Sequence, residues 1–310
     1  MAEALIKNGK HTVTALTRSD SQSTLPEGII VKKVNYDDQS TLVEALKGQD
    51  ALIITLGSQA SSDTDEKLIR AAGEAGVKWI LPNEWGPDNA DETVTRDVFV
   101  LQGKGMPPKN SIYSLILLTP LDKNRDFIAS LNRSSYIALS TGFWYEWSLA
   151  IPSAFGFDFK NRSLTFFDEG KTPISVSTWP QVGRAVASIL SLPQADLDTI
   201  RNKIVYVKSF TVSQRDMFDS ALRVTGTKEA DWTINKEPAH ERYANGIAEM
   251  KQGSRDGFAK MLYTRIFYDD GNGDFETRRG VSNKLLGLPQ ENIDEATNRA
   301  IKRSEQSPWS

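Results

Sequence analysis

The chain has 310 residues, of which 37 are basic and 40 are acidic, so its formal net charge is -3, and 39% of its residues are hydrophobic. This balance is typical of a globular protein with a buried core, and it leaves no basic excess for binding the phosphates of nucleic acid. Cysteine is absent, which excludes disulfides, thiolate nucleophiles and cysteine-bound metal centres, and the presence of just two histidines excludes a histidine-rich metal site.

The sequence gives no sign of a membrane span or of a secretory leader. Its longest largely apolar run, Ile112 to Leu118, is far shorter than the roughly 20 residues that a membrane-spanning helix needs. The opening residues, Met1 to Leu5, lack the basic region and long apolar stretch of a signal peptide. We therefore expect a cytoplasmic protein without a membrane partner.

Short apolar runs alternate with amphipathic stretches through the first half of the chain. Four runs rich in β-branched and aliphatic residues are predicted strands: 11–17, 29–34, 51–56 and 77–81. Helices are predicted over 40–48 and from Asp63, where the spacing of Asp63 and Glu66 resembles a capping box, to a left-handed cap at Gly76. Strands and helices in this order predict a parallel sheet covered by helices on both faces.

The alternation returns in the second half of the chain. It predicts a strand, a helix and a second strand: 135–139, 180–192 and 203–207. Ser213 begins another helix, which ends at Gly226, and residues 237–300 are polar and mostly helical. The second half therefore predicts a continuation of the α/β layer followed by a helical C-terminal part.

Two stretches depart from this pattern. The chain starts inside a predicted helix, Ala2 to Asn8, with no strand before it. Residues 103–120 contain two adjacent prolines followed by an apolar run without periodicity. We regard 103–120 as an anomalous insertion and expect it to be translated intron sequence.

The stretch from Leu68 to Gly86, which ends in Leu-Pro-Asn-Glu-Trp-Gly, resembles a helix, strand and loop of NmrA-like and isoflavone-reductase-like proteins. Four further stretches carry the same resemblance: His11 to Arg18, Ser140 to Trp147, Thr178 to Val186 and Val212 to Phe218. Within this family of atypical short-chain dehydrogenases, the sequence is most similar to fungal oxidoreductases of the CipA type.

The resemblance implies an α/β, Rossmann-like, doubly wound parallel sheet that binds NADP(H), with a smaller, mostly helical C-terminal substrate lobe. Residues 1–150 and 178–209 are the expected cofactor domain, and residues 151–177 and 210–303 are the expected lobe. In the family, a glycine-rich loop after the first strand holds the pyrophosphate. No Gly-x-Gly-x-x-Gly or Gly-x-x-Gly-x-x-Gly occurs here. We therefore expect a truncated sheet that lacks its first strand, in an incomplete gene product, with loss of activity as one consequence.

Residues after the first two predicted strands are candidate cofactor ligands. The resemblance places Arg18 where an arginine accommodates the 2′-phosphate of NADP, with Thr17 and Ser19 as hydroxyl donors. The alternative is a surface arginine that closes a strand. Asp37 is a candidate for the border of the adenine pocket, and the alternative is an acidic pair at a helix N-terminus.

The ends of the next two strands supply further candidates. Thr55, Leu56 and Gly57 are expected cofactor contacts, because the carboxyl ends of parallel strands line the binding crevice. Asn83 is a candidate cofactor ligand and Trp85 a candidate substrate contact, in a loop that meets the nicotinamide side in relatives. For both segments, an ordinary turn after a strand is the alternative.

The predicted catalytic residue is a lysine. No Tyr-x-x-x-Lys, the acid pair of ordinary short-chain dehydrogenases, occurs in the sequence. The resemblance instead implies a single lysine in the helix before the strand at 135–139, where Lys123 is the nearest match. A lysine desolvated beside bound cofactor can act as a general acid or base with a lowered pKa. A solvated helix lysine is the alternative.

Three aromatic residues follow the strand at 135–139 and are candidate substrate contacts: Phe143, Trp144 and Tyr145. An aromatic cluster at the mouth of a crevice suits a flat, aryl-bearing substrate. The alternative is an aromatic core between the two lobes.

The resemblance implies that the chain is an NADPH-dependent reductase of a small aromatic substrate from secondary metabolism. We expect it to act as a monomer or homodimer, without metal and without nucleic acid. The alternative function is an NmrA-type regulatory protein that senses NADP without catalysis, and a non-functional fragment is a third possibility. A buried lysine at position 123 beside a cleft would favour the enzyme.

Overall fold

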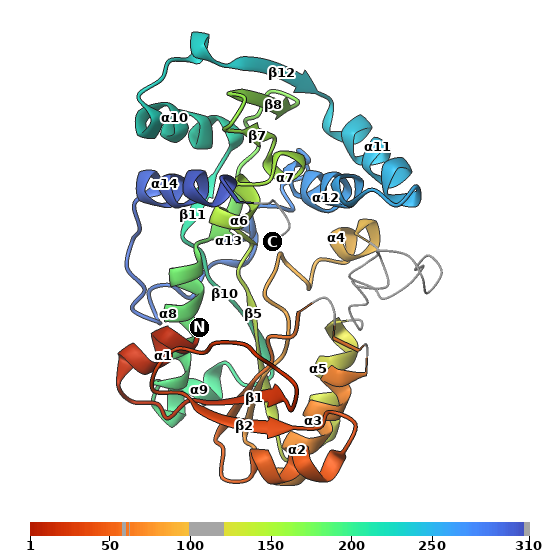
Figure 1. Cartoon of the computed structure of the whole chain (residues 1–310), viewed down its shortest axis with the longest axis vertical. Coiled ribbons are helices and arrows are strands. Elements are labelled where there is room, and N and C mark those ends of the chain that lie inside the picture. The colour runs from red at the N-terminus through yellow and green to blue at the C-terminus, as the bar shows by residue number, and fades with distance from the viewer. Residues whose placement is uncertain (58–59, 62, 99–120, 307–310) are drawn as a thin grey trace.

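The computed structural model describes residues 1–57, 60–61, 63–98 and 121–306 (Figure 1). The predicted anomalous insertion at 103–120 lies outside the described residues. The α/β part occupies the lower half of Figure 1 and the C-terminal lobe the upper half. None of the described helices combines the length and the apolar character needed to cross a membrane.

The largest sheet is entirely parallel and has the strand order β10-β5-β4-β3. Its strands are β3 (Ala51–Ile53), β4 (Trp79–Leu81), β5 (Ser135–Ser140) and β10 (Lys203–Tyr206). Two more strands, β1 (Thr14–Arg18) and β2 (Ile30–Val34), form a separate parallel pair with Thr14 opposite Ile30. Within the described residues, no ladder joins β1 to β3.

Helices cover both faces of these strands (Figure 1). One face carries α1 (Ala2–Asn8), α8 (Trp179–Leu190) and α9 (Gln194–Thr199), and the other carries α2 (Gln39–Leu46), α3 (Thr64–Ala75) and α5 (Leu121–Ser130). Strand β4 shows the alternation: Trp79 and Leu81 pack on the α8 side, whereas Ile80 packs on the α3 side. A parallel sheet buried on both faces is the arrangement of α/β folds, so the predicted fold class is confirmed.

Local capping signals define the ends of several helices. Gly76 and Gly226 end α3 and α10 (Gln214–Thr225) in the left-handed region, with φ of 80° and 65°. Ser213 and Asp216 form a reciprocal capping box at the start of α10. The predicted capping box at Asp63 was wrong, because the Asp63 side chain makes no cap hydrogen bond and instead pairs with Lys67 at 2.8 Å.

The C-terminal lobe has its own apolar core, built from aromatic and aliphatic side chains of residues 143–300. Its helices are α6 (Tyr145–Leu149), α7 (Pro152–Phe155), α10, α11 (Ala239–Lys251), α12 (Arg255–Thr264), α13 (Phe275–Arg279) and α14 (Ile293–Ser304), with 3-10 turns at Glu229–Asp231 and Arg265–Phe267. Helix α4 (Glu92–Asp97) packs against this lobe through Val94.

Two small sheets complete the lobe and were not predicted from the sequence. One has the order β11-β9-β6 and the other β12-β8-β7. The strands are β6 (Phe143–Trp144), β7 (Phe157–Asp158), β8 (Ser163–Phe167), β9 (Ile174–Ser177), β11 (Phe210–Val212) and β12 (Thr233–Glu237). Strands β6 and β7 have two residues each and carry no periodicity, and every ladder of the two sheets except that of β7 with β8 joins residues more than 30 positions apart.

Candidate active site

The carboxyl ends of β1, β3, β4 and β5 meet at one edge of the α/β part. Parallel strands place their carboxyl ends on the same side, where open α/β sheets bind ligands in a crevice. Most of the predicted site residues follow these strands directly: Arg18 ends β1, Thr55 and Gly57 follow β3, and Asn83 follows β4. The fold therefore gathers at one edge residues that are far apart in the sequence.

At the end of β1, a buried hydroxyl lies next to an exposed cation. The Oγ1 atom of Thr17 is buried and has no hydrogen-bond partner among the described residues. The side chain of Arg18 is 70% exposed and lies 3.4 Å from the carboxylate of Asp20, also exposed. Ser19 is exposed as well. An exposed ion pair of this kind contributes at most about 1 kcal/mol, so the Arg18 guanidinium is available to a stronger anion.

Tyr36 and Asp37 follow β2 and make different contacts. The Tyr36 hydroxyl donates to the carbonyl oxygen of Leu16 over 3.2 Å, and partial burial raises the pKa of this phenol. Asp37 is exposed, and its carboxylate lies 2.7 Å from the Nζ atom of Lys67 at the start of α3. The structure thus joins Asp37 to α3. A contact between Asp37 and an adenine ring stays a prediction.

The loop after β4 packs against the end of β3. The Asn83 amide donates to the carbonyl oxygen of Leu56 over 3.1 Å, and the Trp85 indole donates to the carbonyl oxygen of Ile54 over 2.8 Å. A Cβ atom at Gly57 would meet no atom of the described residues within 4 Å. These bonds hold the two predicted loops together as one wall of the crevice.

Two buried polar contacts beside this wall were not predicted. Glu84 forms an ion pair with Arg125 of α5 at 3.5 Å, with the Glu84 side chain 2% exposed. Asp65 of α3 is hydrogen-bonded by Asn124, and its burial raises the pKa of its carboxyl to about 6. No local pattern marks such pairs, because the partners belong to elements that meet only in the folded chain.

The two contacts fix the first turn of α5, which also carries Lys123. The Lys123 side chain is exposed in the structure. It is not among the residues that line the cavity described below. Within the described part of the chain, the structure therefore does not show the desolvated surroundings expected for a catalytic lysine, and the catalytic role of Lys123 stays a prediction.

The three aromatic candidates after β5 have different surroundings. Phe143 packs against Tyr263 with ring centroids 4.2 Å apart. Tyr145 is fully buried, and its hydroxyl is 2.8 Å from the hydroxyl of Thr297. Trp144 is half-buried, and its indole nitrogen is buried without a partner among the described residues. Phe143 and Tyr145 thus have contacts typical of the lobe's core, whereas Trp144 keeps a free hydrogen-bond donor.

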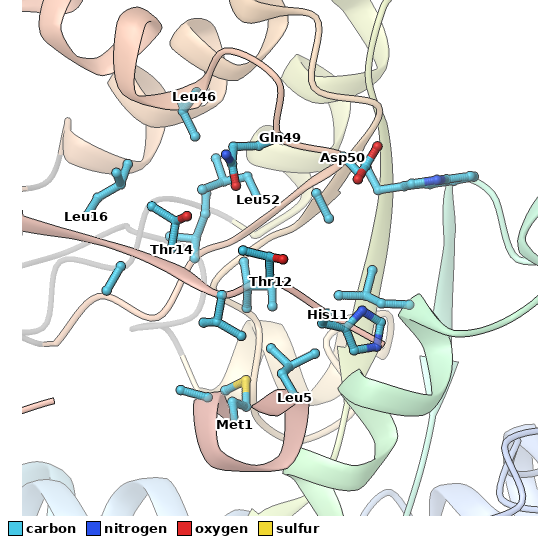
Figure 2. Close-up of a pocket in the computed structure, with 18 of the residues that line it drawn as sticks. Met1, Leu5, His11, Thr12, Thr14, Leu16, Leu46, Gln49, Asp50 and Leu52 are labelled. Atoms are coloured by element: carbon cyan, nitrogen blue, oxygen red, sulfur yellow. The ribbon is translucent and has the colours of Figure 1, made fainter. Parts of the chain in front are cut away.

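A cavity of about 1130 Å³ lies between β1 and β3, and Figure 2 shows Thr14, Leu16 and Leu52 among the residues around it. Thr17, Tyr36, Thr55 and Leu56 line its end near the crevice. The Thr17 hydroxyl, which has no partner among the described residues, fits a sugar or phosphate oxygen of a nucleotide. Arg18 follows Thr17 in the chain and is not among the residues that line the cavity. A glycine-rich turn for the pyrophosphate is not found in the described part of the chain, nor does any group of three His, Asp or Glu side chains there suit a metal ion.

Comparisons with known proteins define the class of this chain. Residues 1–86 match the profile of a family described as NAD(P)H-binding. The oxidoreductase aprR of Aspergillus flavus is 27% identical over 308 residues, which is 97% of this chain and 94% of aprR. The chain is therefore similar along its whole length to a fungal oxidoreductase and has an NAD(P)H-binding fold.

Solved structures narrow the fold further. A crystal structure of isoflavone reductase superposes on this chain with a TM-score of 0.69 and 18% sequence identity. The match covers 96% of this chain and 93% of the isoflavone reductase chain. The structure of AtPrR2 with NADP+ and (+)pinoresinol gives a TM-score of 0.70 and 16% identity, over 95% and 93% of the two chains. The chain therefore has the fold of these isoflavone-reductase-like structures, and the comparisons support the resemblance seen in its motifs.

Proposed function

We propose that this chain is an NADPH-dependent reductase of a small, aromatic substrate. The observation that carries the proposal is the end of β1, where the exposed guanidinium of Arg18 follows the buried hydroxyl of Thr17, which has no partner among the described residues. Bound NADPH would supply the hydride for the reduction. The match of residues 1–86 to an NAD(P)H-binding family, and the NADP+ in the AtPrR2 structure, support this choice of cofactor.

On the cofactor side, Arg18 selects NADPH over NADH. Its planar guanidinium can bind a phosphate through two parallel hydrogen bonds. The exposed Asp20 carboxylate, 3.4 Å away, is a weaker partner for Arg18 than this phosphate. Thr17 donates its hydroxyl proton to the neighbouring ribose or phosphate oxygen, which satisfies a group that is otherwise buried without a partner. NADH has no 2′-phosphate and gains nothing from Arg18.

On the substrate side, Trp144 provides one hydrogen-bond donor. A buried indole N–H without a partner costs free energy, and an oxygen atom of a bound substrate would remove that cost. Trp85, whose own N–H is held by Ile54, offers an aromatic surface nearby in the loop after β4. An aryl group suits such surroundings, because aromatic rings stack on one another at modest entropic cost.

The proton for the reduction comes from Lys123 or from water. Lys123 lies on the first turn of α5, which the Arg125–Glu84 ion pair and the Asn124–Asp65 hydrogen bond hold against the crevice wall. Its exposure is the observation that favours the second candidate function, an NADP-sensing regulatory protein without catalysis. For that candidate, cofactor binding would persist and turnover would be absent.

A titration with NADPH and with NADH, followed by quenching of the fluorescence of the seven tryptophans, is the first test. Saturable binding with NADPH preferred, and consumption of NADPH with aromatic ketones or enones, would support the reductase. Binding without turnover in the wild-type protein and in Lys123→Ala alike would support the regulator. A cooperatively folded chain that binds neither cofactor would contradict both candidates and would agree with an inactive protein.

A further inference from the structure

A surface groove of about 410 Å³ lies among α6, the start of α8 and the last turns of α14. Helix α14 packs against α6, and α8 lies below both in Figure 1. The groove is lined by two tryptophans, three basic side chains and one amide: Trp147, Trp179, Arg299, Lys302, Arg303 and Gln306. We call it the tryptophan groove. None of these six residues lines the cavity between β1 and β3, so the groove is a different space.

One buried carboxylate fixes the groove's shape. The Glu146 side chain, on α6, is 1% exposed, and its Oε1 atom accepts a hydrogen bond from Nε of Arg299 at 2.9 Å. Its Oε2 atom accepts from the backbone N–H of Trp179 at 3.1 Å. The carboxylate thus links α6, α8 and α14 at the groove. It also balances the charge of Arg299, so this arginine has a structural role.

The aromatic part of the groove leaves one indole accessible. The rings of Trp147 and Trp179 have centroids 6.5 Å apart and planes tilted by 53°. The guanidinium of Arg303 lies 4.5 Å from the Trp147 ring centroid and donates to the Gln306 side-chain oxygen at 3.2 Å. Trp147 is therefore packed against a cation, whereas Trp179 remains 40% exposed. The exposed surface of Trp179 is the aromatic surface that a ligand can reach.

A positive charge lies beside this aromatic surface. The Lys302 side chain is exposed, lines the groove and forms no ion pair with any residue that the structure describes. The residue four positions earlier on α14 is Asn298, so the helix provides no acidic partner at the spacing that favours one. An ammonium group and an indole surface in one groove can recognise an anion and a ring in the same molecule.

We propose that the tryptophan groove binds a planar aromatic ring that carries a carboxylate, sulfate or phosphate group. The ring packs against the exposed surface of Trp179, and the anionic group pairs with Lys302. The guanidinium of Arg303 adds positive potential beside the anion. A volume of about 410 Å³ lies within the range of roughly 300–1,000 Å³ that is usual for small-molecule sites.

Two probes that differ in charge test this site on the full chain. Naphthoate carries the ring and the anion, and naphthamide is its neutral counterpart of nearly equal shape. The indole N–H signals of ¹⁵N-labelled protein report binding, and Trp147→Phe and Trp179→Phe assign the two signals of interest. Naphthoate should shift both signals saturably, and naphthamide should bind roughly fivefold more weakly. Raising NaCl from about 50 to about 500 mM should weaken only the binding of naphthoate.

Three results of this titration would overturn the proposal. Equal affinity for naphthoate and naphthamide would show that the groove does not recognise the anion. An absence of shifts at Trp147 and Trp179 would show that the ring does not bind there. Shifts confined to Trp85 and Trp144 would place naphthoate at the proposed substrate site instead.

Lys302→Gln tests the charge with a matched control. It should weaken naphthoate binding about two- to fivefold and leave naphthamide binding unchanged. Lys251→Gln is the control, because Lys251 is also an exposed lysine in the last turn of a helix, α11, and interacts with the helix dipole in the same way. Lys251→Gln should leave both affinities unchanged. Equal effects of the two substitutions on naphthoate binding would contradict a contact between Lys302 and the anion.

Trp179→Leu tests the aromatic surface. It should weaken the binding of both probes roughly two- to tenfold, since the ring loses its aromatic partner. Leu285→Ala changes another exposed apolar side chain and should alter neither affinity. Unchanged binding of both probes to Trp179→Leu would overturn the stacking role of Trp179.

This inference does not rest on the proposed function, and the two can fail separately. Naphthoate binding without NADPH binding would contradict the reductase alone. NADPH binding without shifts at Trp147 and Trp179 on addition of naphthoate would contradict the groove alone. Competitive displacement of naphthoate from the groove by NADPH would identify the groove as a nucleotide site and would overturn its separation from the cofactor crevice.

Discussion

Arg279 of α13 and Asp88 of the loop after β4 form an ion pair, with 2.9 Å between Nε and Oδ2, that ties the C-terminal lobe to the sheet. The side chain of Asp88 is completely buried. Its other oxygen accepts hydrogen bonds from the Tyr206 hydroxyl at 2.8 Å and from the Ala90 amide at 3.1 Å. One carboxylate therefore joins β10, α13 and the loop that carries Asn83 and Trp85.

Asp88→Asn should lower the free energy of unfolding by about 2 kcal/mol, because hydrogen bonds to a charged group are worth about 1.5–3 kcal/mol. Urea unfolding followed by tryptophan fluorescence measures this change. Glu44→Gln is the matched control, since Glu44 pairs with Lys47 at the surface, where such a change is usually within about 0.5 kcal/mol. Equal effects of the two substitutions would show that burial of Asp88 does not strengthen its contacts.

Arg18→Ala should weaken NADPH binding by roughly 10- to 100-fold and leave NADH binding within about twofold, because charge-assisted hydrogen bonds to phosphate contribute about 1.5–3 kcal/mol. Fluorescence titrations of both cofactors measure the two affinities. Lys47→Ala removes another exposed positive charge, on α2's C-terminal side, and should change neither. A parallel loss of both cofactors in Arg18→Ala would remove Arg18 from the 2′-phosphate site.

Trp144→Phe and Trp85→Phe form a matched pair, because only one of the two indole N–H groups has a partner in the described structure. Trp85 donates to Ile54, so Trp85→Phe should cost about 1 kcal/mol of stability. Trp144 has no partner, so Trp144→Phe should be neutral or slightly stabilising in the absence of ligand. Thermal unfolding of both variants tests this order, and a larger loss in Trp144→Phe would contradict it.

The stability of the protein should depend on pH through Asp65. Burial raises the pKa of this carboxyl from 3.8 to about 6, so between these values the folded state holds a proton that the unfolded state has lost. The contribution of Asp65 to stability is therefore greatest below pH 4, falls as the pH rises to about 6, and is constant above that.

Asp65→Asn removes this dependence, since the amide stays neutral. The free energy of unfolding of the variant, relative to that of wild type, should rise by roughly 2 kcal/mol from about pH 4 to about pH 7. One unit of pKa shift corresponds to about 1.4 kcal/mol. Urea unfolding at several pH values measures the difference, with Asp269→Asn on the exposed turn as control. A constant difference between Asp65→Asn and wild type across this range would contradict a raised pKa for Asp65.

Helix and strand positions in the α/β part followed from local patterns, with small shifts at their ends. The strand predicted at 11–17 is β1 at Thr14–Arg18, and the helix predicted over 180–192 is α8 at Trp179–Leu190. The cap at Gly226 depends on one glycine with φ of 65°. These features depend on residues within one or two turns of each other, so the sequence alone can reveal them.

Site residues were predicted less completely, and the reason is also physical. The positions of Arg18, Thr55 and Asn83 at strand ends followed from the predicted strands, and parallel strands bring such ends together. Their contacts with a cofactor stay predictions. The Glu84–Arg125 pair and the carboxylate of Asp65 were missed, because burial and partners of a charged side chain depend on how distant helices pack. The packing of distant elements also determines that Lys123 is exposed and that Tyr145 contacts the core of the lobe.

The sequence by itself determined the alternation of strands and helices, the absence of cysteine chemistry and the resemblance to reductases, because composition, periodicity and motifs are local properties. Only the tertiary structure decided which charges are buried together, which indole N–H has no partner among the described residues, and that a cavity lies between β1 and β3. Those properties arise from contacts between residues that are distant along the chain, and their free energies depend on burial that no local pattern records.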